Sequence, residues 1–131
     1  MYLSFLLGAL SRATNFPNLW LVKSNAFNGC TILGTVVLND GTTADKITTI
    51  ETKAFYNCTS LVDINFANSI QTIGVSAFEN CVLLNTFVLL PTSLVTLSDR
   101  AFYNCDALER VALPENVDDT KIGTEVFASC D

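Results

Sequence analysis

The pentapeptide AFYNC occurs twice in this chain of 131 residues, at 54–58 and again at 101–105. Three looser copies, AFNGC, AFENC and VFASC, stand at 26–30, 77–81 and 126–130. Successive copies are 28, 23, 24 and 25 residues apart, and together they contain all five cysteines of the chain. Self-similarity at a period of about 20–50 residues is typical of proteins built from stacked repeats. This period constrains the fold more strongly than any local pattern.

The residues between the pentapeptides also recur. The pattern L-x-x-I-x-L begins three residues after each of the first four cysteines, at 33–38, 61–66, 84–89 and 108–113. A second apolar pair then closes each unit, namely Ile47/Ile50, Ile70/Ile73, Leu94/Leu97 and Val117/Ile122. Alternation at the end of the first pattern is typical of a strand. Each repeat is therefore predicted to be a rung of two short extended pieces, with at most one turn of 3₁₀ or α-helix in the pentapeptide.

Stacking of such rungs explains the pentapeptide. Equivalent residues of successive rungs would lie roughly 4.7–4.9 Å apart. We expect one ladder of six phenylalanines, from Phe5 to Phe127, and a second ladder of five buried, unpaired cysteines. The asparagines before cysteine are predicted to hydrogen-bond backbone groups at the corner; they are Asn57, Asn80 and Asn104.

The frame resembles the BspA-like leucine-rich repeat. Residues 60–81 carry its pattern best and lack only the proline, whereas residues 107–130 include the proline but have two extra residues in the second half. The resemblance implies a β-rich leucine-rich-repeat solenoid with short helical or 3₁₀ turns, five to six stacked rungs and a parallel sheet on its concave face. It also implies protein binding or adhesion, and not catalysis.

The resemblance covers nearly the whole chain, so residues 1–131 are expected to form one such solenoid. Residues 1–25 fit as a degenerate N-terminal rung, because SFLLGALS aligns with AFYNCDAL and places Phe5 at the phenylalanine position. A signal peptide cleaved from residues 1–10 is the alternative. Because the chain begins with apolar residues and shows no polar cap, we expect either a piece of a longer repeat chain or a subunit whose ends neighbours cover.

Several classes of function are disfavoured. The formal charge of −6 and the scattered basic residues argue against nucleic acid as a partner. No apolar run approaches the ~18–20 residues that span a membrane. The chain has no histidine, its cysteines are widely spaced, and its carboxylates are not paired, so we expect no enzyme, no metal and no cofactor. The sequon Asn57-Cys58-Thr59 is expected to be buried and to carry no glycan.

The outward residues of the predicted concave sheet are the candidate binding site. If the L, I and L positions point inward, the residues between them form a mixed, lightly charged strip suited to a protein. These candidates are Arg12, Thr35, Val37, Val62, Asp63, Asn65, Asn85, Thr86, Val88, Glu109, Arg110 and Ala112. A solvated face without a partner is the alternative, and Trp20 is either a core filler or an anchor.

The function expected from these patterns is a non-enzymatic protein–protein interaction or scaffold module, in a subunit or segment of a larger assembly. Its partners would be other protein chains, which would also cover the ends of the solenoid. We favour an intracellular or organellar assembly. The alternative is a secreted or cell-surface adhesion domain, with residues 1–10 as its signal peptide and a glycan on Asn57.

Overall fold

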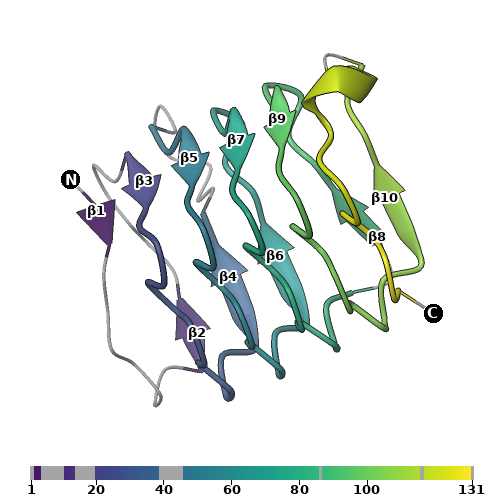
Figure 1. Cartoon of the computed structure of the whole chain (residues 1–131). Helices are drawn as coiled ribbons and strands as arrows, with labels where there is room; N and C mark the ends of the chain where they lie inside the picture. Colours follow the sequence, from purple (N-terminus) through teal and green to yellow (C-terminus); the bar gives the residue numbers. More distant parts are fainter. Residues whose placement is uncertain are drawn as a thin grey trace.

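The chain winds through a stack of about six rungs, each of which contributes short parallel strands to two sides of a solenoid (Figure 1). The computed structural model describes residues 2–3, 11–13, 20–38, 46–85, 87–115 and 117–130. Strand β1 lies at one end of the stack and β10 at the other. The prediction of a β-rich solenoid is confirmed.

One side is a continuous five-stranded parallel sheet in the order β1-β3-β5-β7-β9. Its strands are β1 (Tyr2–Leu3), β3 (Leu21–Val22), β5 (Thr49–Ile50), β7 (Thr72–Ile73) and β9 (Thr96–Leu97). Strands β5, β7 and β9 each end with the second member of an apolar pair, namely Ile50, Ile73 and Leu97. The second residue of each strand from β3 onward is fully buried, while the first is half-buried and faces outward.

The L-x-x-I-x-L side is divided into two sheets, where the sequence had predicted one. One sheet has the order β2-β4-β6, from Arg12–Ala13, Thr35–Val37 and Asp63–Asn65, and the other pairs β8 (Phe87–Leu89) with β10 (Arg110–Ala112). The division follows from one extra residue in the fourth rung. Buried Leu84 and Leu90 are six positions apart, whereas the corresponding Leu61 and Phe66 are five apart.

The extra residue reverses two predicted orientations. Val88 is 4% exposed and Leu89 is 67% exposed, so Val88 lies in the core and its assignment to the outer strip was wrong. Aligning the two patterns at Leu84 and Leu108 had placed Thr86 beside Arg110. In the structure Phe87 pairs with Arg110, and Thr86 lies outside the described residues.

The predicted alignment of the first rung was also wrong by one position. Aligning SFLLGALS with AFYNCDAL had placed Arg12 beside Gly34, whereas in the structure Arg12 pairs with Thr35. Phe5, which anchored that alignment, lies outside the described residues.

The pentapeptides stack at one corner of the solenoid and form the phenylalanine ladder. The rings of Phe27, Phe55, Phe78 and Phe102 are parallel, with successive centroids 5.0, 5.0 and 5.1 Å apart, and Phe127 follows at 5.7 Å. The rungs are also joined through the backbone, as where the Phe55 N–H donates to the Ala77 carbonyl at 2.8 Å. The predicted ladder is confirmed from Phe27 onward.

The cysteines form the second ladder as free thiols, as predicted, although Cys130 is half-buried and not buried like the other four. From Cys58 onward, each thiol donates to the carbonyl of the phenylalanine one rung earlier. The Sγ···O distances are 3.1 Å for Cys58 to Phe27, and 3.2 Å for Cys81 to Phe55, Cys105 to Phe78 and Cys130 to Phe102. Cysteine therefore fills a tight buried corner and also satisfies a buried backbone acceptor.

The asparagines before cysteine bond to one another, and within the described residues their side chains show none of the backbone bonds that the sequence had predicted. Asn80 Nδ2 donates to Asn57 Oδ1 at 2.7 Å, and Asn104 Nδ2 donates to Asn80 Oδ1 at 2.9 Å. All three have positive φ, between 56° and 64°. Asparagine tolerates this conformation better than most residues, which explains its recurrence here.

Candidate functional site

The outward residues of β2, β4, β6, β8 and β10, with the residues just before these strands, form what we call the binding face. Strand pairing places Arg12, Thr35 and Asp63 in one row, and Val37 and Asn65 in the next. The predicted candidates that belong to this face and are described are Arg12, Thr35, Val37, Val62, Asp63, Asn65, Asn85, Glu109, Arg110 and Ala112. Leu89 takes the outward place that Val88 had been given.

Four large apolar side chains are exposed on or beside the binding face. Val62 is 47% exposed and Leu89 is 67% exposed, and Ile32 and Leu83 are 49% and 51% exposed. The sequence analysis missed Ile32, Leu83 and Leu89. Ile32 and Leu83 could have been found, because each precedes the buried leucine that opens a strand pattern and so must point away from it.

A hollow of about 370 Å³ lies where the sheets separate between β6 and β8. Asp63, Asn65 and Asn68 line it from one side, and Leu89 and Pro91 from the other. The hollow therefore places an apolar wall opposite amide and carboxylate groups. This combination suits a protein segment that carries both apolar and hydrogen-bonding side chains.

A charged cluster at the corner was also missed. The carboxylate of buried Glu79 lies 3.1 Å from the guanidinium of Arg100, which stacks over the Tyr103 ring at 4.0 Å. Glu125 approaches the same guanidinium at 3.6 Å. Glu79 and Tyr103 are both the third residue of successive pentapeptides, so the repeat predicts that they lie on neighbouring rungs. The cluster joins three rungs and neutralises a buried carboxylate.

Two thiols of the ladder hold their protons more tightly than an ordinary cysteine does. Burial and the neighbouring Cys58 raise the pKa of the Cys81 thiol well above its ordinary value. Burial and the neighbouring Cys130 likewise raise the pKa of Cys105. Within the described ranges, no group of three or more metal-ligating side chains is placed to hold an ion.

Two further predictions are corrected. Trp20 is 57% exposed, so it is not a core filler. Asn57 is half-buried, whereas full burial had been expected.

Solved structures of leucine-rich repeat proteins resemble this chain. A leucine-rich repeat protein of T. pallidum is 31% identical with a TM-score of 0.78, over 88% of this chain and 51% of that one. A leucine-rich repeat protein of Bacteroides ovatus has 23% identity and a TM-score of 0.72, over 98% of this chain and 38% of that one, and supports the fold alone. The present chain thus spans about half the length of these proteins, or less.

A leucine-rich cell surface protein of Faecalibacterium prausnitzii is 25% identical with a TM-score of 0.55, over 86% of this chain and 34% of that one. No curated protein matches the sequence. In the part of the chain that the structure describes, no helix has the length and apolar character needed to cross a bilayer.

The sequence profile of the BspA type leucine-rich repeat region matches residues 21–131 in six copies. Such repeats imply a protein-interaction module and are generally not enzymes. The matched residues include every described strand from β3 to β10 and all five pentapeptides. The chain therefore belongs to the BspA-type leucine-rich repeat family.

Proposed function

We propose that this protein is a non-enzymatic scaffold module whose binding face docks another protein chain within a larger assembly. The observation that carries the proposal is the set of exposed apolar side chains on or beside that face, which includes Val62 and Leu89. Exposed apolar side chains rimmed by polar ones mark surfaces where proteins associate. Asp63, Glu109 and Arg110 supply the polar rim.

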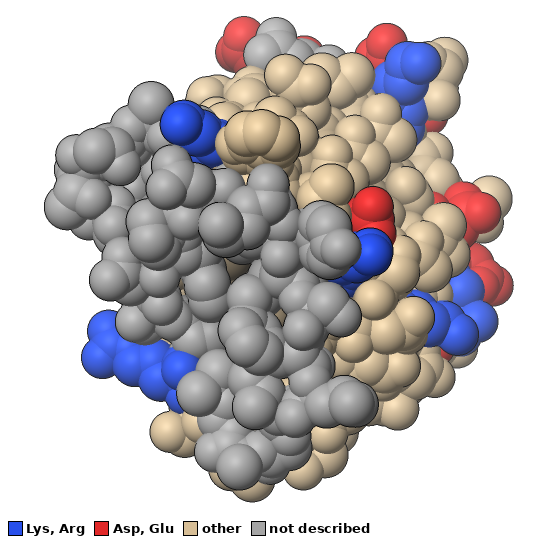
Figure 2. Space-filling view, turned by 90° about the vertical axis from the view of Figure 1, so that its left-hand side faces the viewer, with Lys and Arg blue, Asp and Glu red and all other residues tan. Residues whose placement is uncertain are grey.

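The distribution of charge supports a protein partner over a polyanion. Basic and acidic side chains lie interspersed among uncharged ones on the described surface seen from the N-terminal end (Figure 2). The whole chain has seven basic and thirteen acidic residues. Such a surface lacks the positive field that binding to nucleic acid requires.

Cross-linking followed by mass spectrometry in the native extract would identify the partner. The reactive lysines are spread along the solenoid, at Lys23, Lys46, Lys53 and Lys121. Reproducible links to one set of proteins are expected for an assembly subunit. The absence of protein links would contradict the proposal.

Paired variants then locate the docking surface. Val62→Asp and Leu89→Asp each place a charge among the exposed apolar residues, and we expect each to weaken the identified complex by at least about tenfold. Val75→Asp is the matched control. Val75 is 40% exposed, but it lies just before the pentapeptide at 77–81 and not on the binding face. Equal effects of all three substitutions on the dissociation constant would show that docking does not use the binding face.

A secreted or cell-surface adhesion module is the second candidate. The F. prausnitzii structure is described as a cell surface protein, which supports this alternative. The intact mass of the native chain distinguishes the two. Loss of residues 1–10, or a glycan on Asn57, would favour the exported module, and an unmodified mass would favour the assembly subunit.

A further inference from the structure

We propose that the outer face of the five-stranded sheet binds an uncharged glycan chain laid along the axis of the solenoid. This site lies on a different side from the binding face and does not depend on the function proposed above. It would give the protein a carbohydrate-binding activity in addition to its contacts with protein.

The first observation is a row of threonines. Thr49, Thr72 and Thr96 are paired in register on adjacent strands, and all three are half-buried with their side chains outward. None of the three hydroxyls has a hydrogen-bond partner among the described residues. Each rung thus offers one hydroxyl, which both donates and accepts, at the spacing of one strand.

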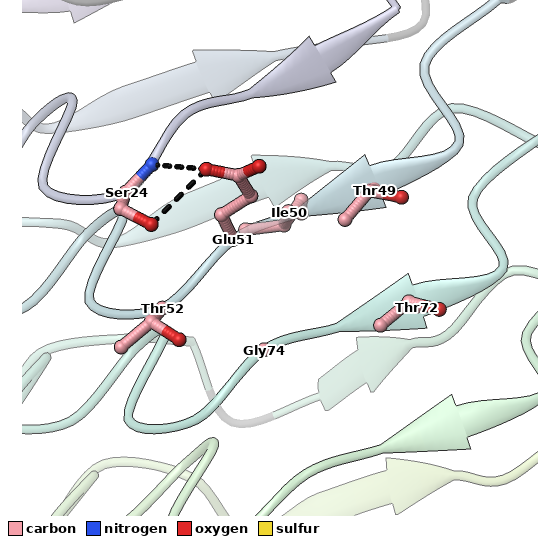
Figure 3. Close-up of a pocket in the computed structure, with 7 residues that line it drawn as sticks. All are labelled: Ser24, Thr49, Ile50, Glu51, Thr52, Thr72 and Gly74. Carbon is pink, nitrogen blue, oxygen red and sulfur yellow. Dashed lines mark hydrogen bonds between the residues drawn. The ribbon is translucent and has the colours of Figure 1, made fainter.

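The second observation is a pair of shallow hollows two rungs apart on this face. One, of about 360 Å³, is lined by Thr49, Thr72 and Gly74, and is drawn in Figure 3. The other, of about 430 Å³, is lined by Thr96 and Gly123 among others. The two glycines occupy equivalent positions in alternate rungs.

The glycines are required by close contact between rungs. A Cβ at Gly74 would lie 2.7 Å from the backbone of Glu51 and Thr52, and a Cβ at Gly123 would lie 2.3 Å from the backbone nitrogen of Asp99. Neither position can therefore carry a side chain of its own without shifting the neighbouring rung. Both hollows stay open to a ligand.

The third observation is a fixed carboxylate beside each hollow. Glu51 Oε2 accepts from the backbone N–H of Ser24 at 2.8 Å and from its hydroxyl at 3.0 Å, as Figure 3 shows. Asp99 Oδ1 accepts from the Thr124 N–H at 2.7 Å. The second oxygen of each carboxylate has no partner within the described ranges. Each hollow therefore holds an oriented, unused acceptor next to unused hydroxyls.

These groups fit a neutral sugar chain. Sugar hydroxyls can donate to a carboxylate and can both donate to and accept from threonine. A polyanion would be repelled by the carboxylates and by the net charge of −6. Since successive rungs are 5.0–5.1 Å apart at the corner, the hollows recur every roughly 10 Å. An extended β-1,4-linked glycan, in which alternate sugars face the same way, has a comparable repeat.

An exposed aromatic residue stands immediately before β3, the neighbour of β5 in this sheet. Trp20 precedes β3 and is 57% exposed, and its carbonyl accepts from the Thr48 N–H at 2.9 Å. An indole ring in this position offers a flat apolar surface for a sugar ring. The charge, hydroxyl spacing and exposed aromatic residue all point to the same class of ligand.

The test uses the full chain of 131 residues and two soluble probes, cellohexaose and chitohexaose, in calorimetric titrations and amide NMR spectra. We expect one or both to bind, with shifted amides at Thr49, Thr72 and Thr96. Thr72→Val and Thr96→Val keep the side-chain shape and remove a hydroxyl, and each should weaken binding about three- to tenfold. Thr35→Val, on the binding face, is the matched control and should leave the affinity unchanged.

The opposing results are equally clear. No binding of either hexasaccharide at millimolar concentration would overturn the proposal, as would binding that both valine variants leave intact. Tighter binding of hexalysine than of either sugar, lost in Glu51→Gln, would also overturn it, because the site would then be ionic. Val62→Asp and Leu89→Asp should not affect sugar binding, so this test and that of protein docking can fail separately.

Discussion

The corner of the solenoid and its L-x-x-I-x-L side are built by the same repeat, but only the corner keeps one register along the described stack. From Phe27 to Phe102 the rings stay 5.0–5.1 Å apart. The other side shifts by one residue at β8, and its strands divide into two sheets. At the corner a ring, a thiol and backbone groups contact the next rung together, so an extra residue would break several contacts at once. In a strand of two or three residues, an extra residue disrupts fewer contacts between rungs and therefore costs less free energy.

The ladder is the part most sensitive to substitution. Phe78→Ala should lower the free energy of unfolding by about 3–5 kcal/mol, because Phe78 is fully buried between two stacked rings and the cavity cannot close. Urea denaturation followed by circular dichroism measures the change.

Phe127→Ala is the matched control for this prediction. Phe127 is half-buried and stacks on only Phe102 within the described rungs, so its loss should be no more than about half as large. Equal losses at the two positions would show that the ladder does not act as a continuous core.

Alkaline pH should lower the free energy of unfolding through the thiols of the corner. The folded state raises the pKa of the Cys81 and Cys105 thiols above the ordinary value of 9.0, so only the unfolded chain loses these protons at moderately high pH. The contribution of these two thiols to stability should be constant below about pH 8 and fall above pH 9 by up to about 1.4 kcal/mol per pH unit for each thiol.

The double variant Cys81→Ala/Cys105→Ala separates this effect from other alkaline titrations. It should be less stable at neutral pH and should lose stability less steeply above pH 9. The same slope in both proteins, measured by urea titrations across the pH range, would remove the thiols as its cause.

Neighbouring substitutions in β8 test the shifted register. Val88→Ala should lower the free energy of unfolding by about 2 kcal/mol, because Val88 is 4% exposed. Leu89→Ala should change it by less than about 0.5 kcal/mol, because Leu89 is 67% exposed. The reverse order in thermal or urea unfolding would restore the register expected from the repeat.

Much of the fold could be predicted because the repeat supplies several aligned copies of the same information. Phe55, Phe78 and their cysteines occupy fixed places in a frame that recurs, and each place has one physical role. The register of β8 could not be predicted, because residues 87–90 are four apolar residues in a row and the frame needs only two of them buried. Periodicity cannot show which residue is the extra one.

The strands that form the binding face could be located from the sequence, but the exposure of Leu89 depended on the register of β8. The threonine row was missed for another reason. Thr49, Thr72 and Thr96 are ordinary strand residues in the sequence, and only the pairing of β5, β7 and β9 shows that they stand side by side.

The hydrogen bonds that join the pentapeptides run from rung to rung, as from the Phe78 N–H to the Ala101 carbonyl at 2.8 Å. They therefore lie along the direction in which the stack would be stretched if its two ends were pulled apart. Under such a load the bonds between two rungs are strained together, while those inside each rung are not. The solenoid should extend by parting at one interface after another, in a series of small steps and not in one rupture. Such a solenoid can lengthen under tension as interfaces between rungs separate, and the same contacts can re-form when the tension is released.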